Sequence, residues 1–286
     1  MTTLINKLTA VKSITRMDKP IGTYLLLWPT YWALWVASDG FPNIHLLLVF
    51  TLGVFVMRSA GCVINDFADR HVDGQVKRTQ HRPLVSGTLS SKEAIALFVL
   101  LLFIALLLVL TLSAYTIKLS LIGVALATLY PFMKRFTHLP QVVLGAAFSW
   151  GMIMAFSEAK GEIPLEAWLL FAANLLWTVA YDTMYAMVDR DDDLLIGVKS
   201  TAILFGQFDK RVVGILQLIT LALLFQVGEL LAFGWPFQLS LIICAGLFCY
   251  QQILIFERDR DKCFQAFLNN HLVGLIVFFG IFIEYL

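Results

Sequence analysis

Charged residues are scarce in this sequence of 286 residues, in which Asp, Glu, Lys and Arg make up 14% and hydrophobic residues 59%. A soluble globular domain carries about 25% charged residues. The shortage excludes a soluble fold for most of the chain and indicates that lipid is its main solvent. With a net charge of only +1, the composition gives no sign of a nucleic-acid partner.

Cysteine and histidine are also few. The four cysteines form no CxxC pair and have no histidine at the spacing of a zinc site, and the five histidines form no HxxxH pair. The first 19 residues lack the cleavage-site pattern of a secretory signal peptide, and the acidic Asp18 argues against a mitochondrial transit peptide. We therefore expect neither zinc nor a removable leader.

Long apolar runs fill most of the chain. Because about 20 residues of α-helix cross a hydrocarbon core of about 30 Å, we predict an all-α polytopic membrane protein with nine transmembrane helices in one domain, residues 1–286. The predicted spans are residues 21–38, 45–64, 94–113, 116–133, 141–157, 165–185, 212–231, 237–256 and 265–285.

The basic residues lie almost entirely on one side of this arrangement. With nine spans, 18 of the 21 Lys and Arg residues fall in the N-terminal segment or in every second connection, whereas Lys118 and Lys160 fall on the other side. Cytoplasmic connections carry the excess of Lys and Arg, so we predict a cytoplasmic N-terminus and a periplasmic C-terminus. Arg58 lies deep inside a predicted span, whereas Lys118 stands near the end of one.

Two cytoplasmic connections, 66–92 and 186–211, are longer than packing requires, and such loops are usually functional or disordered. An acidic stretch, Asn65-Asp66-Phe67-Ala68-Asp69-Arg70-His71-Val72-Asp73, opens the first. The second contains Asp189-Arg190-Asp191-Asp192-Asp193, so the pattern DRxxD recurs 120 residues later. The recurrence indicates an internal repeat, or at least two equivalent loops that meet over one cavity.

Asp69 and Asp73 are four residues apart, as are Asp189 and Asp193, so each pair shares one helix face and repels itself. A hard cation with oxygen ligands would relieve this repulsion, and Mg²⁺ completes its shell with water and phosphate oxygens. Two such clusters, each followed by basic residues, would hold a diphosphate through Mg²⁺ and stabilise it as a leaving group.

If the diphosphate is attached to an allylic carbon, its departure leaves a carbocation that needs a dry pocket with aromatic faces. Tyr181 and Tyr185, one helical turn apart beside Asp182, are candidate walls of that pocket. A long isoprenoid tail would explain the membrane setting. Alternatively, the acidic runs are solvated surface and the two tyrosines are interfacial anchors.

The two aspartate motifs, Asn65-Asp66-x-x-Asp69-x-x-x-Asp73 and Asp189-x-x-x-Asp193, resemble the paired motifs of the UbiA superfamily of intramembrane aromatic prenyltransferases. More narrowly, several blocks look like the bacterial 4-hydroxybenzoate polyprenyltransferases of ubiquinone biosynthesis, and the likeness covers nearly the whole chain. These blocks begin at Asp18, Leu27, Arg58, Tyr130, Tyr181 and Lys199.

This resemblance implies nine helices around a central cavity that opens near the cytoplasmic side of a bacterial inner membrane, with no obligate protein partner. It implies Mg²⁺-dependent transfer of a polyprenyl group from polyprenyl diphosphate to the ring carbon ortho to the hydroxyl of 4-hydroxybenzoate. The metal ligands and catalytic residues would be Asn65, Asp66, Asp69, Asp73, Asp189 and Asp193. The substrate-binding candidates are Arg58, Lys77, Arg78, Arg82, Lys134, Arg135, Tyr181, Asp182, Tyr185 and Lys199.

The carboxylate of the acceptor should pair with a fixed guanidinium, whose planar fork matches it. Arg58 is a candidate because a charge inside a membrane span marks a functional site by default. Arg135 is the second candidate, although a simple positive-inside anchor explains it equally well.

Other functions remain open at this point. A transporter would place ionisable groups near the bilayer midplane, whereas the acidic residues here lie at span ends. A phosphatidyltransferase that uses a CDP-alcohol would need further motif residues after Asp73-Gly74, and these are missing. UbiA-type enzymes with other aromatic acceptors share both aspartate motifs, so the motifs alone do not name the acceptor.

Overall fold

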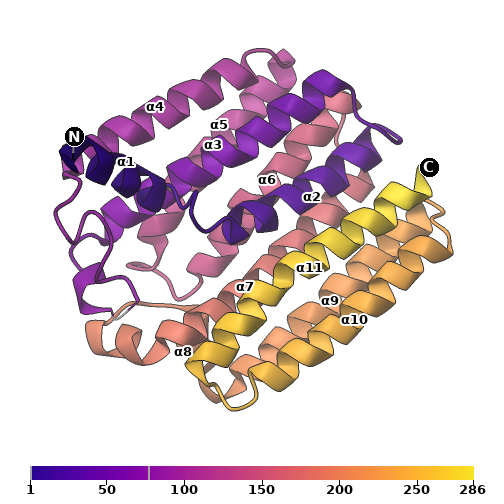
Figure 1. Cartoon of the computed structure of the whole chain (residues 1–286). Helices are drawn as coiled ribbons and strands as arrows, with labels where there is room; N and C mark the ends of the chain where they lie inside the picture. The colour runs from indigo at the N-terminus through magenta and orange to yellow at the C-terminus, as the bar shows by residue number, and fades with distance from the viewer. Residues whose placement is uncertain (1, 77) are drawn as a thin grey trace.

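Helices account for all the regular structure in residues 2–76 and 78–286, which are the residues described by the computed structural model in Figure 1. The long helices are α2 (Ile21–Ala37), α3 (Ile44–Asp69), α4 (Ser91–Val109), α5 (Ala114–Met133), α6 (Pro140–Ala159), α7 (Leu165–Ile196), α9 (Asp209–Leu230), α10 (Trp235–Leu254) and α11 (Arg260–Glu284). The short ones are α1 (Thr2–Ile14), η1 (Asp73–Gln75), α8 (Thr201–Phe205) and η2 (Gly206–Phe208). The prediction of an all-α protein is confirmed.

Seven helical segments in the described part of the chain are long and apolar enough to cross a membrane. They are α3, α4, α5, α6, the segment Thr201–Leu230 that ends with α9, α10 and α11. Of the other two long helices, α2 has only 17 residues and α7, with 32 residues, carries a run of acidic residues. These helices make the chain a multi-pass membrane protein, while the count of nine crossings stays a prediction.

The long helices pack side by side in two groups (Figure 1). In the first group α3 contacts α2, α4 and α5, and α5 contacts α6; in the second α9, α10 and α11 pack in sequence. Two helices join the groups, since α2 contacts both α6 and α11, and α7 contacts α6, α9 and α11. Gly145 allows close packing of α6 on α7, because a Cβ there would lie 2.9 Å from the carbonyl oxygen of Leu175.

Local signals in the sequence fix several helix ends. Ser90 and Glu93 form a capping box at the start of α4, in which each side chain accepts a hydrogen bond from the other residue's backbone N–H. Pro140 begins α6, where its missing N–H is not needed. Gly197 ends α7 with a φ of 73°, a left-handed conformation that glycine adopts without strain.

The prediction that residues 186–211 form a long connection is wrong for the first part of this segment, which is helical. α7 continues past the predicted end of the span at residue 185 and carries the second acidic stretch on its last turns, as far as Ile196. α8 and η2 then lead into α9. As a result the second motif is held on a rigid helix rather than on a loop.

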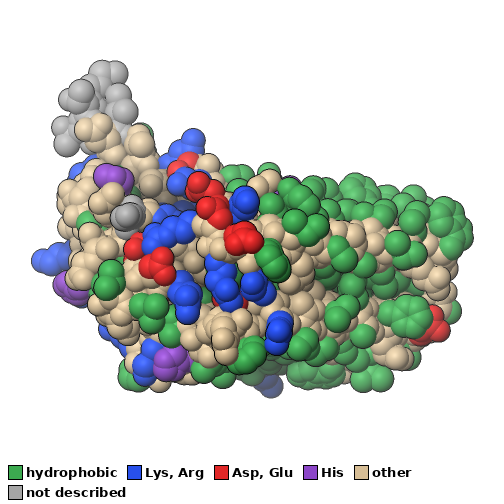
Figure 2. All heavy atoms as spheres, turned by 90° about the horizontal axis from the view of Figure 1, so that it is seen from below, with side chains coloured by type: hydrophobic (Ala, Val, Ile, Leu, Met, Phe, Trp, Pro, Cys, Tyr) green, Lys and Arg blue, Asp and Glu red, His purple; other side chains and the backbone are tan. Residues whose placement is uncertain are grey.

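Charged side chains gather at one end of the molecule. Figure 2 shows Lys, Arg, Asp and Glu over the end that carries α1, the connection after α3 and α8, whereas hydrophobic side chains cover much of the rest. Large apolar residues such as Leu121, Trp235 and Ile253 are exposed on the flanks, which suits contact with lipid. The charged end is therefore the end at which a water-soluble group can enter.

Candidate active site

A polar pocket of about 160 Å³ lies at the charged end, between the end of α3, the connection that follows it, and the last turns of α7. Side chains from both acidic stretches line it. They are Asn65, Asp69 and Asp73 from the first stretch, and Asp189 and Asp193, preceded by Asp182, from the second. The structure thus brings together two stretches that are 120 residues apart.

In the first acidic stretch, the carboxylates that line the pocket are paired with basic side chains. Lys134, at the end of α5, forms an ion pair with Asp69. Arg82 Nη1 lies 2.8 Å from Asp73 Oδ2, and Arg82 itself lines the pocket. Because these cations already lie among the acidic side chains, phosphate oxygens that enter the pocket will meet positive charge as well as any bound metal.

In the second stretch, Arg78 donates hydrogen bonds to Asp189, the shortest from Nη2 to Oδ2 at 2.5 Å. The Arg78 guanidinium also lies over the Tyr185 ring, 4.6 Å from its centroid. Asp193 has no ion-pair partner among residues 2–76 and 78–286. Burial, together with the neighbouring Asp189 carboxylate, raises the pKa of Asp193 to about 7.

The pocket has oxygen atoms to offer a cation, although in the described residues no three His, Cys, Asp or Glu side chains already stand together as a metal site. Asp69 Oδ1 is buried without a hydrogen-bond partner. Asp193 repels Asp189 and lacks a cation of its own in the described part of the chain. Both residues line the pocket, and a hard cation such as Mg²⁺ would satisfy both.

Asp66 does not line the polar pocket. Its carboxylate is almost fully buried and accepts hydrogen bonds from Arg16, at 2.8 and 3.0 Å, outside the set of residues that line the pocket. Arg82 also contacts Asp66, at 3.0 Å. Burial alone would lower the pKa of Arg82, but the negative charges of Asp66 and Asp73 outweigh burial, so the pKa is raised. Asp66 therefore lies outside the pocket lining, and its assignment as a metal ligand stays a prediction.

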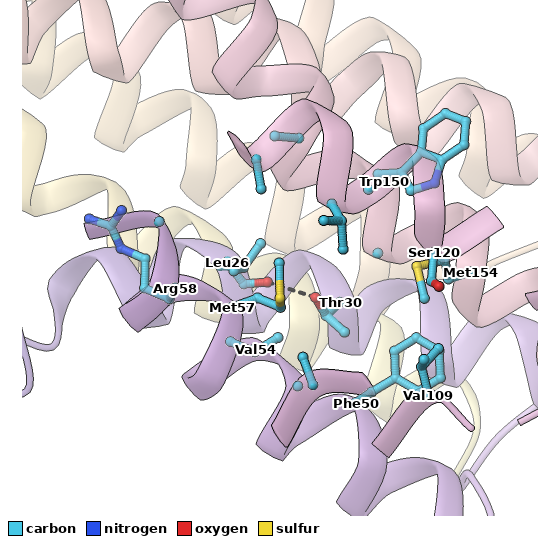
Figure 3. Close-up of a pocket in the computed structure, with 18 of the residues that line it drawn as sticks. Leu26, Thr30, Phe50, Val54, Met57, Arg58, Val109, Ser120, Trp150 and Met154 are labelled. Carbon is cyan, nitrogen blue, oxygen red and sulfur yellow. Dashed lines mark hydrogen bonds between the residues drawn. The ribbon is translucent and has the colours of Figure 1, made fainter. Parts of the chain in front are cut away.

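A second, apolar cavity of about 400 Å³ adjoins the polar pocket and is lined by α2 to α6. Tyr130 lines both spaces, so they meet at its side chain, where its hydroxyl donates to Asn65 Oδ1 at 3.3 Å. Figure 3 shows Arg58 on one side of the cavity and Trp150 and Phe50 on the other. The polar pocket and the apolar cavity are therefore neighbours that share Tyr130 as a common wall.

The whole chain has close relatives. The sequence profile of the UbiA prenyltransferase family matches residues 26–279. The chain belongs to this family. It is 73% identical over 277 residues to a protein of Colwellia psychrerythraea named 4-hydroxybenzoate octaprenyltransferase, covering 97% of this chain and 96% of that protein. A protein of the same name from Klebsiella pneumoniae is 60% identical over 281 residues, covering 98% of each.

Solved structures of the family share the fold. The apo structure of a UbiA homologue from Aeropyrum pernix matches 92% of this chain and 98% of its own, with a TM-score of 0.81 and 26% identity. A UbiA homologue from Archaeoglobus fulgidus, solved with GPP and Mg²⁺, covers 96% of this chain and 99% of its own at a TM-score of 0.73 and 18% identity. The second likeness shows the fold alone.

The structure also places the remaining predicted site residues of this UbiA family member. Tyr185 and Lys199 line the polar pocket, and Arg58 lines the apolar cavity. Tyr181 lines neither: it is buried in the core, with its ring against Trp177 and Phe267. Tyr181 thus lies apart from the lining of both spaces, and its role as a wall of the substrate pocket stays a prediction.

Arg135 and Lys77 are the two remaining basic candidates from the sequence. Arg135 is exposed, and its Nη2 donates to the carbonyl oxygen of Ala68 near the end of α3. Lys77 lies outside the described residues. Asp191 and Asp192, whose roles the sequence left open, both contact Arg260. Arg135 therefore contacts the end of α3, and its role in binding the acceptor stays a prediction.

Among the lining residues that the sequence did not single out, Gln141 and Tyr130 stand out. Gln141, a buried polar residue in the first turn of the apolar α6, lies beside the Asp182 carboxylate and accepts a hydrogen bond from the Thr201 N–H at 3.2 Å. Tyr130 joins the two spaces. A buried amide in an otherwise apolar helix was the available signal for Gln141, because such a group needs a partner.

Proposed function

We infer that this chain transfers a polyprenyl group from polyprenyl diphosphate to the ring carbon ortho to the hydroxyl of 4-hydroxybenzoate, releasing diphosphate, as a step of ubiquinone biosynthesis. The observation that carries the inference is the meeting of the two spaces at Tyr130, one lined by both aspartate motifs and the other almost wholly apolar. Relatives that bear this activity in their names, at 73% and 60% identity over nearly their full length, support the choice of acceptor.

The diphosphate end of the donor fits the polar pocket. Bound Mg²⁺ supplies positive charge to the diphosphate oxygens as the C–O bond breaks. The residues that would hold it are Asn65, Asp69, Asp73, Asp189 and Asp193. The basic side chains of the same lining, Arg78, Arg82, Lys134 and Lys199, are placed to donate hydrogen bonds to the phosphate oxygens. The aspartates would thus act on the diphosphate through the metal, and the basic residues would act on it directly.

The isoprenoid end of the donor fits the apolar cavity. A Cβ built on Gly53 or Gly61 of α3, both in the cavity wall, would meet no atom within 4 Å, so these positions leave room for a chain. Leu106 of α4 and Leu121 of α5 line the cavity and are 47% and 68% exposed. The cavity therefore reaches the lipid between α4 and α5, where the rest of a long tail can lie.

The acceptor fits at the junction between the two ends. Arg58 is the only charged residue among the described residues of the cavity lining, and its Nε is buried without a hydrogen-bond partner. The acceptor carboxylate would supply that partner through both guanidinium arms. Gly22 makes the position possible, because a Cβ there would overlap the guanidinium. The ortho carbon then bonds to the allylic carbon, and its proton is lost as the ring becomes aromatic again.

We further propose that the nine long helices cross a bacterial inner membrane, with the N-terminus and the active site toward the cytoplasm, as one domain that contains two equivalent acidic segments. The gathering of Lys and Arg at the end that holds the polar pocket supports this orientation, because cytoplasmic segments carry the excess of basic residues.

The deciding experiment measures prenyl transfer in membranes supplied with 4-hydroxybenzoate and a polyprenyl diphosphate, with and without Mg²⁺. We expect a product alkylated ortho to the hydroxyl, and no product after complete removal of divalent metal. Product that persists without metal would contradict the proposed mechanism. If Asp69→Ala abolished uptake of a solute into vesicles and left prenyl transfer intact, a transporter would be the better interpretation.

A further inference from the structure

Arg16 lies just beyond the end of α1 and reaches the border of the polar pocket without lining it. Its backbone has a φ of 57°, in the left-handed region that non-glycine residues rarely adopt. Both terminal nitrogens of its guanidinium are held, since Nη1 donates to the carbonyl oxygen of Ser13 at 2.6 Å and Nη2 donates to the Asp66 carboxylate. The unfavourable backbone conformation thus serves to aim a guanidinium at one buried acid.

The contact connects Arg16 to the diphosphate pocket through a short chain of charges. Asp66 receives Arg16 on one side and Arg82 on the other, and Arg82 Nη1 also contacts Asp73, a pocket residue, at 2.8 Å. With Arg16 present, two arginines balance two carboxylates. Without it, Arg82 alone would have to balance both Asp66 and Asp73.

We propose that Arg16 is a positioning residue for the donor diphosphate: by neutralising Asp66, it leaves Arg82 available to Asp73 and to the phosphate oxygens. The proposal rests on the proposed function, because it assigns the polar pocket to a diphosphate. It also gives α1 a role in the site, since Arg16 ties the N-terminal helix to the last turn of α3.

The test removes the guanidinium without disturbing the backbone. Arg16→Gly tolerates the left-handed φ, so its fold should be preserved. We expect the KM for the prenyl diphosphate to rise about tenfold or more, as happens when a buried carboxylate loses its partner, while the KM for the aromatic acid stays unchanged. Arg16→Lys should recover part of the loss, because a lysine keeps the charge and loses the planar fork.

The matched control is Lys7→Ala. Lys7 pairs α1 with Glu93 of α4, so this variant removes another ion pair of the same helix, but one in which both side chains are about half exposed. Such pairs contribute little, and we expect the kinetics of Lys7→Ala to match those of the unaltered protein. Equal effects of Lys7→Ala and Arg16→Gly would overturn the proposal, since both would then report only the docking of α1.

The decisive variant is Arg16→Gly combined with Asp66→Asn. If Arg16 acts by neutralising Asp66, removing that charge should bring the KM for the diphosphate back to within about threefold of the Asp66→Asn value, as expected for two coupled sites. Additive losses, or complete inactivity of Asp66→Asn alone, would refute the proposal and make Asp66 a ligand in its own right.

A binding measurement separates this proposal from the proposed function. Inorganic diphosphate with Mg²⁺ should raise the melting temperature of the purified unaltered protein, and higher diphosphate concentrations should be needed for the same shift in Arg16→Gly. If the unaltered protein shows this shift but transfers no prenyl group, the proposed function fails and the role of Arg16 stands. A shift of equal size and midpoint in both proteins would overturn the role of Arg16.

Discussion

The polar pocket and the apolar cavity meet at one tyrosine, yet they recognise a ligand by opposite means. In the polar pocket Arg78, Arg82 and Lys134 are each paired with a carboxylate, so the exact placement of charge matters more than volume. In the apolar cavity the described lining holds one charged residue, Arg58, and glycines that leave open space. A change of charge should therefore damage the first space, and a change of volume the second.

The largest effects are expected from loss of a carboxylate in the polar pocket. Asp69→Asn and Asp193→Asn keep the shape of the side chain but remove a charge on which the metal depends, and we expect kcat/KM to fall roughly 10²–10³-fold at saturating Mg²⁺. Asp192→Asn is the matched control, because Asp192 is the neighbour of Asp193 on α7 but is absent from the pocket lining and contacts Arg260.

Initial rates of prenyl transfer at several Mg²⁺ concentrations are the measurement for these three variants. Asp192→Asn should retain nearly the rate of the unaltered protein. If Asp69→Asn and Asp193→Asn behaved like Asp192→Asn, the polar pocket would not be the site of the chemistry.

Replacement of Arg58, near the junction of the two spaces, is expected to have a smaller effect, limited to the KM of one substrate. Arg58→Lys keeps a positive charge but loses the planar fork, so the KM for 4-hydroxybenzoate should rise about tenfold or more while the KM for the diphosphate is unchanged. An acceptor analogue whose carboxylate is replaced by a neutral amide should be used equally well by the variant and the unaltered protein. Equal changes in the KM of both substrates would remove Arg58 from the acceptor site.

The apolar cavity should respond to volume and to the length of the donor. Gly61 and Gly53 are eight residues apart on α3, about 12 Å along the helix, and Gly61 is the nearer to the polar pocket. Gly61→Leu should therefore slow transfer from all donors, whereas Gly53→Leu should slow long donors about fivefold and spare the shortest, because overpacking acts only where the chain reaches.

Gly246→Leu on α10 is the control for this pair, since a Cβ there also meets no atom within 4 Å but the residue is absent from the cavity lining. The measurement is the ratio of kcat/KM for a long and a short prenyl diphosphate. A ratio that is the same in Gly53→Leu, Gly246→Leu and the unaltered protein would place the tail elsewhere.

Periodicity in the sequence accounts for much of this architecture. The apolar runs predict the long helices, and the i, i+4 spacing of Asp69 with Asp73 and of Asp189 with Asp193 is compatible with the shared pocket that these four residues line. Sequence periodicity does not predict the length of α7. The acidic run at its end suggests a solvated loop, but in the folded protein contacts with distant residues such as Arg78 and Arg260 stabilise it as helix.

Side-chain direction near the site also depended on distant parts of the chain. Asp66 and Asp69 are only three residues apart, but Asp66 turns to Arg16, fifty residues earlier, and Asp69 to Lys134, sixty-five residues later. Tyr181 packs into the core against Phe267 for the same kind of reason. No local sequence pattern could predict which of these side chains point into the pocket, since their partners are brought close only by the packing of whole helices.

The smallest effect is expected from Arg135, the residue for which the sequence offered two interpretations. It adjoins Lys134, which lines the polar pocket and pairs with Asp69, but its own guanidinium is exposed and bound to the carbonyl oxygen of Ala68. Arg135→Ala should therefore change the KM of either substrate by less than about threefold, as for most exposed side chains, whereas Lys134→Ala should weaken use of the diphosphate strongly. Steady-state kinetics of the two adjacent variants measure this contrast directly. A large, selective rise in the KM for 4-hydroxybenzoate in Arg135→Ala would move the acceptor carboxylate from Arg58 to Arg135, and with it the acceptor from the apolar junction to the charged surface.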